Sequence, residues 1–191
     1  EYSNLTLAFH TEQNVTYTHF VNVRVYDYLP IFNGLDTMNI EKRLEELKII
    51  LPKSSPPAGA YAKAVILDGY AHLSGQGPRD NDGKPLTGQV PTDLSVDEAI
   101  LAARNVGLYT LVALQDAIGS LDRVEQVVRT FGMVNAAPGF TEHPRVIDGF
   151  SNLFIDIFGE KGRGARSAVG MSSLPFNIPV EVEITIKILA E

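Results

Sequence analysis

The sequence contains no cysteine. It therefore cannot form disulfides, thiolate metal sites or a cysteine nucleophile. No apolar run approaches the roughly 20 residues that a membrane-spanning helix needs, so we expect no membrane partner. The absence of cysteine is compatible with a reducing compartment, and we expect a cytoplasmic protein.

Clusters of basic residues are also missing. The chain has 16 Lys and Arg against 23 Asp and Glu, which gives a formal net charge of -7. Proteins that bind nucleic acids usually present a basic face. We therefore expect no nucleic-acid partner, and a small molecule or another protein is the better expectation.

Familiar metal and cofactor patterns are absent from the sequence. No histidine has another histidine or a carboxylate at a common ligand spacing; the four are His10, His19, His72 and His143. The glycine pairs within 75–77 and 162–164 lack the remaining features of a phosphate-binding loop. We therefore expect neither a metal nor a cofactor.

The composition of the first 37 residues differs from that of the rest. They contain a single basic residue, Arg24, and four of the seven tyrosines, and residues 15–28 alternate with the period of a strand. Met38 then begins a more regular pattern. We interpret 1–37 as an N-terminal extension or an upstream read-through and 38–191 as the domain. The alternative is that 1–37 contains a genuine hairpin packed on the domain.

Residues 38–191 predict a regular order of elements. A short helix is expected over 40–50, and Asp68-Gly69 between apolar runs predicts a hairpin of strands 62–67 and 70–74. Ser95 and Glu98 form a capping box before a helix over 96–118. A strand over 124–136, a helix over 142–158 and strands over 165–172 and 180–189 follow. From the hairpin onward this β-β-α-β-α-β-β order predicts a two-layer α+β domain, with both helices on one face of a mixed sheet.

Three charged residues are candidates for chemistry. Arg166 begins an otherwise uncharged strand, where its desolvation is costly unless it meets an anion, and its planar fork suits a carboxylate. Glu181 and Glu183 share one face of the last strand. That face is either solvated or part of a site shared with another subunit.

Several segments resemble the RidA/YjgF imine-deaminase family. Residues 166–170 (Arg-Ser-Ala-Val-Gly), 174–175 (Leu-Pro) and 180–183 (Val-Glu-Val-Glu) resemble its C-terminal signature. Residues 73–78 resemble its Ser-Gly-Gln-x-Pro segment, and 57–61 its Pro/Gly-rich stretch that ends in tyrosine. The resemblance covers about 55–189, with the segments in the same order.

The resemblance implies a chorismate-mutase-like fold and a homotrimer with sites in clefts between subunits. Family members hydrolyse 2-imino acids, such as 2-iminopropanoate, to 2-oxo acids and ammonia without a metal or cofactor. At the matching positions, Arg166 would clamp the substrate carboxylate and Glu181 would orient or activate water. Tyr61 and Ser74 would line the pocket, and the backbone of Gly75 would hold the substrate. The family is also linked to ribonuclease activity, against which the acidic charge argues.

Two positions depart from the family pattern. Ala168 replaces a cysteine that many members carry two residues after the arginine. Asp148 matches the position of a cleft asparagine, with Asn152 one turn later as the other candidate. These departures indicate a divergent subgroup. They keep two alternatives open: a non-catalytic trimeric module that binds a small carboxylate or a protein, and a structural trimer in which Arg166 pairs with a protein carboxylate.

Overall fold

The computed structural model describes residues 3–10, 16–23 and 39–190. The chain divides into two compact units, Glu1–Asp36 and Thr37–Glu191. In the first, strand β1 (Ser3–His10) pairs antiparallel with strand β2 (Thr16–Val23). The strand predicted over 15–28 is thus present over 16–23. Residues 15 and 24–28 and the proposed start at Met38 lie outside the described residues.

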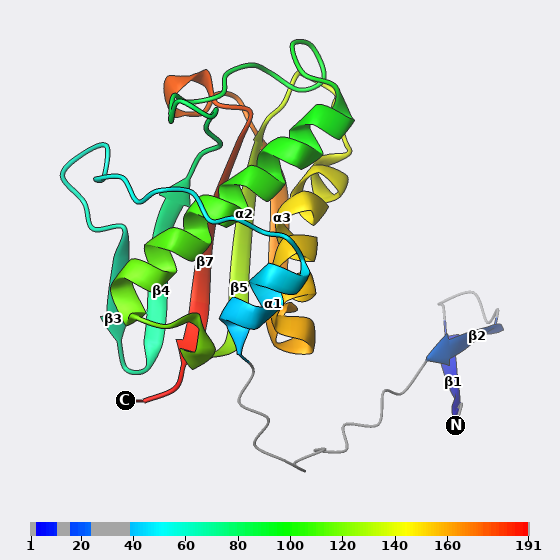
Figure 1. The fold of residues 1–191 in the computed structure, drawn as a ribbon. Coiled ribbons are helices and arrows are strands. Elements are labelled where there is room, and N and C mark those ends of the chain that lie inside the picture. Colours follow the sequence, from blue (N-terminus) through cyan, green and yellow to red (C-terminus); the bar gives the residue numbers. More distant parts are fainter. Residues whose placement is uncertain (1–2, 11–15, 24–38, 191) are drawn as a thin grey trace. The chain divides into compact units, whose positions relative to one another are not determined.

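The second unit is built on a five-stranded sheet (Figure 1). Its strands, in the spatial order β3-β4-β7-β5-β6, are β3 (Ala64–Leu67), β4 (Tyr70–Gln76), β7 (Val180–Ile188), β5 (Val124–Asn135) and β6 (Ala165–Met171). Only β5 and β6 are parallel neighbours. The mixed sheet and the predicted β-β-α-β-α-β-β order are confirmed.

The turn between β3 and β4 has the chemistry that its sequence predicts. Asp68 and Gly69 have φ values of 50° and 77°. A two-residue hairpin turn with both central residues at positive φ matches the twist of the flanking strands, and Asp-Gly adopts it readily. This turn places β4 beside β3 at one edge of the sheet.

Two long helices cover one face of the sheet. Helix α2 (Val96–Ile118) begins with the predicted capping box of Ser95 and Glu98, and helix α3 (His143–Phe158) follows β5. Gly132 on β5 has no side chain at the point where Ile147 of α3 packs, so the helix approaches the strand closely. The core between helices and sheet includes the fully buried side chains of Phe150, Phe154, Phe158, Leu111, Leu114 and Ile186.

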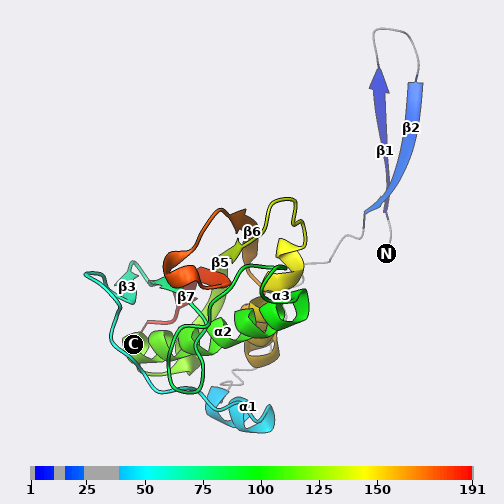
Figure 2. The same ribbon diagram turned by 90° about the horizontal axis from the view of Figure 1, so that it is seen from above.

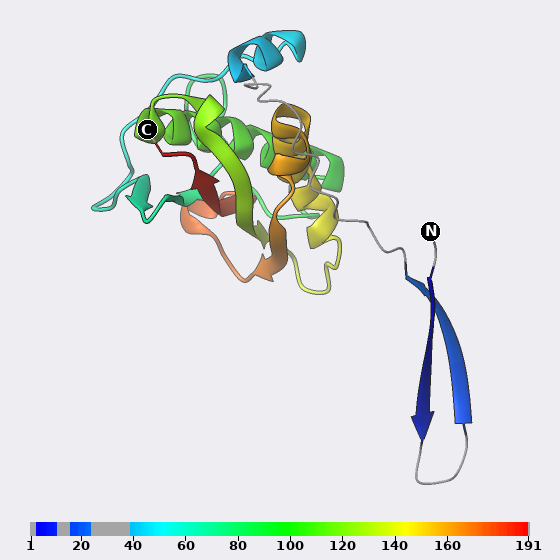
Figure 3. The same cartoon turned by 90° about the horizontal axis from the view of Figure 1, so that it is seen from below.

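Helix α1 (Ile40–Glu46) is shorter than the predicted 40–50. It ends because Lys48 adopts a left-handed conformation (φ 55°), with the N–H groups of Lys48 and Ile49 bonded to the carbonyls of Glu45 and Leu44. Helix α1 lies on the side of α2 and α3 that faces away from the sheet (Figure 2, Figure 3). Within the described ranges, no helix combines the length and apolarity that crossing a membrane requires.

The other face of the sheet is left uncovered by the helices. Along β7, the residues Val180, Val182, Ile184, Ile186 and Ile188 are buried toward the helices, as the sequence alternation predicts. Successive strand residues point to opposite faces. Glu181, Glu183, Thr185 and Lys187 therefore lie on the open face, where they are half-buried or exposed.

Candidate functional site

A cavity of about 480 Å³ opens where β4 and β7 meet the loops that follow β4 and precede β7. Four of the predicted site residues line it: Tyr61, Ser74, Gly75 and Glu181. The other lining residues are mostly small or apolar, and they are Ala58, Gln76, Gly77, Pro78, Arg79, Pro85, Pro175, Phe176 and Ile178. The structure thus brings together residues from four separate parts of the sequence.

The position of Glu181 depends on the backbone of β4. A Cβ atom at Gly75 would collide with the Glu181 carboxyl, so the carboxyl packs directly on bare backbone. The pairing of β4 with β7 is also irregular here, with a register shift between Leu73 and Gln76. Such irregularities redirect strand side chains and are common beside active sites. Glycine and the register shift together make room for a carboxyl at the cavity wall.

The surroundings of Glu181 alter its acidity. Partial burial raises the pKa of its carboxyl above the ordinary value, and the neighbouring negative charge of Glu183 raises it further. Burial disfavours a charged carboxylate, and a like charge nearby does the same. A carboxyl with a raised pKa is better matched to proton transfer near neutral pH.

Ser74 and Tyr61 shape the cavity through local hydrogen bonds. The Ser74 hydroxyl donates to the carbonyl of Ala62 at 2.7 Å, which ties β4 to the chain before β3. The Tyr61 hydroxyl accepts from the backbone N–H of Ala58 at 3.4 Å. These two hydrogen bonds hold residues 58–62 beside Glu181. The Ser74 hydroxyl already donates its proton to Ala62.

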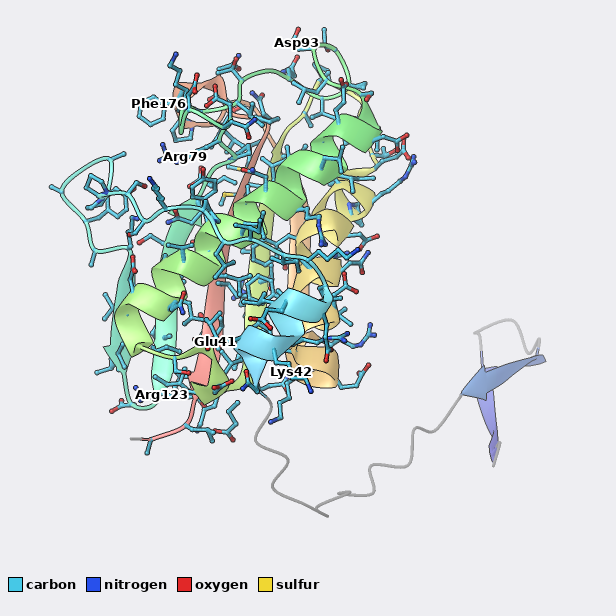
Figure 4. All side chains as sticks on the ribbon, viewed as in Figure 1. Glu41, Lys42, Arg79, Asp93, Arg123 and Phe176 are labelled. Carbon is cyan, nitrogen blue, oxygen red and sulfur yellow. The ribbon has the colours of Figure 1, made fainter. Side chains whose placement is uncertain are left out.

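Four cavity residues have no place in the sequence-based prediction, and they are Arg79, Pro85, Phe176 and Ile178. Arg79 follows the 73–78 segment directly, and Phe176, which is 69% exposed, follows Leu174-Pro175 with a left-handed backbone (φ 56°). Figure 4 shows Arg79 and Phe176 at the same end of the sheet. Arg79 and Phe176 each directly follow a segment that resembles the family. That adjacency is the sequence signal that points to them.

Arg166 lies elsewhere, on edge strand β6. Its Nη1 donates to Asp148 Oδ1 at 2.8 Å and to Ser151 Oγ at 3.0 Å, and its Nη2 donates to the carbonyl of Pro144 at 3.4 Å. Its side chain is only 24% exposed, although its backbone is at the edge of the sheet. The anion that this arginine meets within its own chain is therefore a carboxylate of α3.

The remaining predicted residues accompany Arg166. Asp148 and Asn152 line a smaller cavity of about 180 Å³ with it. Ala168 is half-buried and packs against the core. The eight predicted residues thus form two groups, one around Glu181 and one around or beside Arg166.

The two groups lie on opposite faces of the sheet. Arg166 is in register with Thr130, which is in register with Ile184 of β7. Ile184 faces the helices, so Arg166 does as well, in agreement with its contacts to α3. Glu181 is on the open face. Strand β5 also lies between β7, which carries Glu181, and β6, which carries Arg166, so one chain does not place the arginine and the glutamate in one site.

No group of three or more histidine, aspartate or glutamate side chains is arranged to hold a metal ion within the described residues. The ionisable groups that line the cavity are Tyr61, Arg79 and Glu181. This arrangement can position an organic ligand and exchange a proton with it.

Comparison with known proteins finds relatives of the second unit. Residues 41–187 match the family described as "YjgF/chorismate_mutase-like, putative endoribonuclease". Protein TCP17 of Trypanosoma cruzi is 40% identical over 150 residues, which cover 78% of this chain and 94% of that protein. The predicted resemblance and the predicted chorismate-mutase-like fold are confirmed.

Solved structures agree with this assignment. A protein of unknown function from Agrobacterium tumefaciens, Atu1372, is 37% identical, with a TM-score of 0.72 over 80% of this chain and 96% of that one. A protein from Shewanella oneidensis MR-1, described as a "putative endoribonuclease", is 33% identical, with a TM-score of 0.74 over 78% of this chain and 99% of that one.

Proposed function

Because the chain belongs to the YjgF/chorismate-mutase-like family, we propose that it hydrolyses small 2-imino acids, such as 2-iminopropanoate and 2-iminobutanoate, to 2-oxo acids and ammonia. The observation that carries this proposal is the Glu181 carboxyl, which has a raised pKa and lies at the wall of a cavity with Tyr61, Ser74 and Gly75. The expected cytoplasmic location remains part of the proposal.

The reaction makes modest demands on a protein. An imine carbon is already electrophilic, so catalysis needs mainly positioning and one group that moves a proton. Ionised Glu181 takes a proton from water as the water oxygen bonds to the carbon of the protonated imine, which gives a neutral carbinolamine. Glu181 returns that proton to the nitrogen, the carbon–nitrogen bond breaks, and ammonia leaves while the hydroxyl proton passes to Glu181 and the carbonyl forms.

In this proposal the substrate carboxylate is clamped by Arg166 of a second copy. Arg166 and Glu181 of one chain lie on opposite faces of the sheet, so a shared site requires another subunit. A homotrimer supplies this through a heterologous interface, in which the β6 edge of one copy meets the open cavity of the next. Arg166 must then exchange the carboxylate of Asp148 for that of the substrate.

The direct test follows the decay of 2-iminopropanoate generated in place by an amino-acid oxidase. We expect the protein to accelerate this decay over buffer, and Glu181→Gln and Arg166→Ala each to abolish the acceleration. An Arg104→Ala variant is the matched control, because Arg104 pairs with Asp156 away from both groups. A parent protein that does not accelerate the decay contradicts the proposal.

A second candidate function is a binding module without turnover. The observation that favours it is the pairing of Arg166 with Asp148, which already neutralises the predicted clamp. A ligand that binds only the folded protein stabilises it, and the stabilisation increases with the ratio of ligand concentration to Kd. Thermal shifts with 2-oxo acids in the absence of imine hydrolysis would identify it.

A further inference from the structure

Two exposed aromatic side chains line the cavity beside Glu181. Within residues 39–190, Tyr61 and Phe176 are the two exposed aromatic residues, at 45% and 69%. Both line this one cavity. An aromatic ring left in water forgoes the free energy of burial, and exposed apolar groups that gather in one place mark binding surfaces. The aromatic surface that this part of the chain leaves in water is therefore concentrated at the candidate site.

The backbone at Phe176 is unfavourable. Phe176 and Asn177 both have left-handed φ values, of 56° and 55°. This conformation is costly for residues that carry a β-carbon, and asparagine enters it far more readily than phenylalanine does. Backbone outliers of this kind cluster at active sites and ligand-binding sites. A left-handed backbone at an exposed phenylalanine therefore points to a role in binding rather than in stability.

Hydrogen bonds to a buried side chain hold this conformation in place. Asn135 of β5 is 2% exposed, and its Nδ2 donates to Asn177 Oδ1 at 2.9 Å. The N–H of Gly88 donates to the Asn177 carbonyl at 2.8 Å, and the Asn177 N–H donates to the Leu174 carbonyl at 3.1 Å. The loop that carries Phe176 is thus fixed to the core, and the ring is presented at a defined place on the cavity wall.

The surface around Phe176 is apolar, and the cavity is larger than the smallest imino acids need. Pro85, Pro175 and Ile178 line it together with the ring. Its volume of about 480 Å³ lies within the range of cavities that hold ligands much larger than 2-iminopropanoate, whose side chain is one methyl group. A larger apolar side chain would fill this volume and remove apolar surface from water.

We propose that Phe176 is a specificity-determining residue, and that the preferred substrates are 2-imino acids with a branched or aromatic side chain. The inference rests on the proposed function in taking the cavity beside Glu181 as the reaction site. The substrate side chain packs against the Phe176 ring, while the imine carbon lies at Glu181 and the carboxylate meets Arg166 of a second copy. The ring selects among substrates and moves no proton.

The test compares kcat/KM for two imines that an amino-acid oxidase generates in place, 2-imino-4-methylpentanoate from leucine and 2-iminopropanoate from alanine. The parent should prefer the larger imine. Phe176→Ala should lower kcat/KM for the larger imine by about tenfold or more, and for 2-iminopropanoate by no more than about twofold, because apolar contacts discriminate between side chains by this order. Phe176→Leu should retain most of the preference, because it keeps an apolar side chain at the wall.

Leu101→Ala is the matched control. Leu101 lies on α2, is 66% exposed, which is close to the exposure of Phe176, and does not line the cavity. The change removes a similarly exposed apolar side chain, and we expect it to leave both kcat/KM values unchanged. A loss of preference in Leu101→Ala would mean that the effect does not arise in the cavity and would overturn the inference.

Two further results would overturn it. One is a parent protein without a preference for the larger imine. The other is a Phe176→Ala variant in which both kcat/KM values fall equally. If the assembly of that variant also dissociates on dilution, as size-exclusion chromatography would show, the ring packs between copies and not on the substrate.

Failure of the proposed function looks different. If the parent hydrolyses neither imine, calorimetric Kd values for 4-methyl-2-oxopentanoate and 2-oxopropanoate provide the same comparison of side chains. A preference for the larger acid that Phe176→Ala removes supports the contact with the ring and contradicts hydrolysis. Hydrolysis of both imines that does not depend on Phe176 contradicts this inference alone. A parent that neither hydrolyses the imines nor binds the acids overturns both.

Discussion

The carboxyl group of Glu181 occupies the space that a side chain at position 75 would fill. Because β4 presents bare backbone at Gly75, the carboxyl reaches the wall of the cavity without displacing the strand. This contact fixes the place of the Glu181 carboxyl relative to Ser74 and Tyr61, which line the same cavity. Gly75 is therefore a positioning residue for Glu181.

Gly75→Ala should move the Glu181 carboxyl and slow imine hydrolysis. Displacement of a catalytic group by about 1 Å can cost up to a hundredfold in rate, and we expect a loss of about tenfold to a hundredfold in kcat. The measurement is steady-state imine decay with generated 2-iminopropanoate. A Gly75→Ala variant that accelerates imine decay as strongly as the parent would contradict this positioning role.

The pH dependence of activity should report the Glu181 carboxyl. Burial first, and Glu183 second, raise its pKa above the ordinary 4.5, so the reactive carboxylate forms only at higher pH than for an exposed glutamate. We expect kcat/KM to rise with pH through this raised pKa. Glu183→Gln removes the second cause and should shift the midpoint to lower pH. Glu125→Gln, which removes an exposed glutamate of β5, should not.

The same carboxyl should affect stability with a defined sign. A raised pKa means that the folded protein keeps this proton at pH values where the unfolded chain has released it. Its contribution is complete below the unfolded value near 4.5 and is lost as pH rises through the folded pKa. Glu181→Gln should therefore gain stability relative to the parent over that interval. If the denaturant midpoints of the parent and of Glu181→Gln change by the same amount across this pH interval, the assignment of the raised pKa to Glu181 is contradicted.

Asp148→Asn should free Arg166. The ion pair joins side chains that are 24% and 52% exposed, so its loss should lower the free energy of unfolding by only about 0.5–1 kcal/mol. If Arg166 clamps the substrate, the variant should bind 2-oxo acids several-fold more tightly, since the competing carboxylate is gone.

The matched control for this change is Asp156→Asn. It removes the weaker pair with Arg104, at 3.6 Å, and should leave ligand affinity unchanged. Calorimetric Kd values and denaturant melts on both variants provide the measurement. Unchanged affinity in Asp148→Asn would indicate that Arg166 only ties α3 to β6.

Mixing two inactive variants tests whether sites are shared. Arg166→Ala and Glu181→Gln chains, unfolded together and refolded, should recover about a quarter of the parent activity if each site combines one residue from each of two copies in random assemblies. Either variant refolded alone should stay inactive. Recovery that is absent, although mass spectrometry of the intact assemblies confirms mixed trimers, would contradict a shared site.

The order of elements could be predicted because local signals were strong. The Asp68-Gly69 turn, the Ser95 capping box and the alternation of β7 each determine local structure without help from distant residues. The end of α1 was misplaced because no glycine marks it. Lys48 takes the left-handed conformation that a glycine usually adopts at the end of a helix. A lysine at this position gives no sequence signal for that end.

The site was only partly predictable for a different reason. Glu181, Ser74 and Gly75 share a cavity because β4 and β7 are hydrogen-bonded neighbours, which the recognised motifs imply. The partner of Arg166 depends on how α3 packs on β6, and the charge of Asp148 alone could not reveal it. Arg79 belongs to no periodic pattern, and its place at the cavity wall depends on tertiary contacts with α2.

The separation of Arg166 and Glu181 by the sheet determines which sites of an assembly a substituted chain would inactivate. In a closed ring of copies, each chain would serve two reaction centres, giving its arginine to one and its glutamate to another. A substitution of Arg166 in one chain would then inactivate the site that contains the neighbour's glutamate, while the site that contains its own glutamate stayed active. One such chain in a trimer would inactivate one site of three, and a chain that lacked both Arg166 and Glu181 would inactivate two.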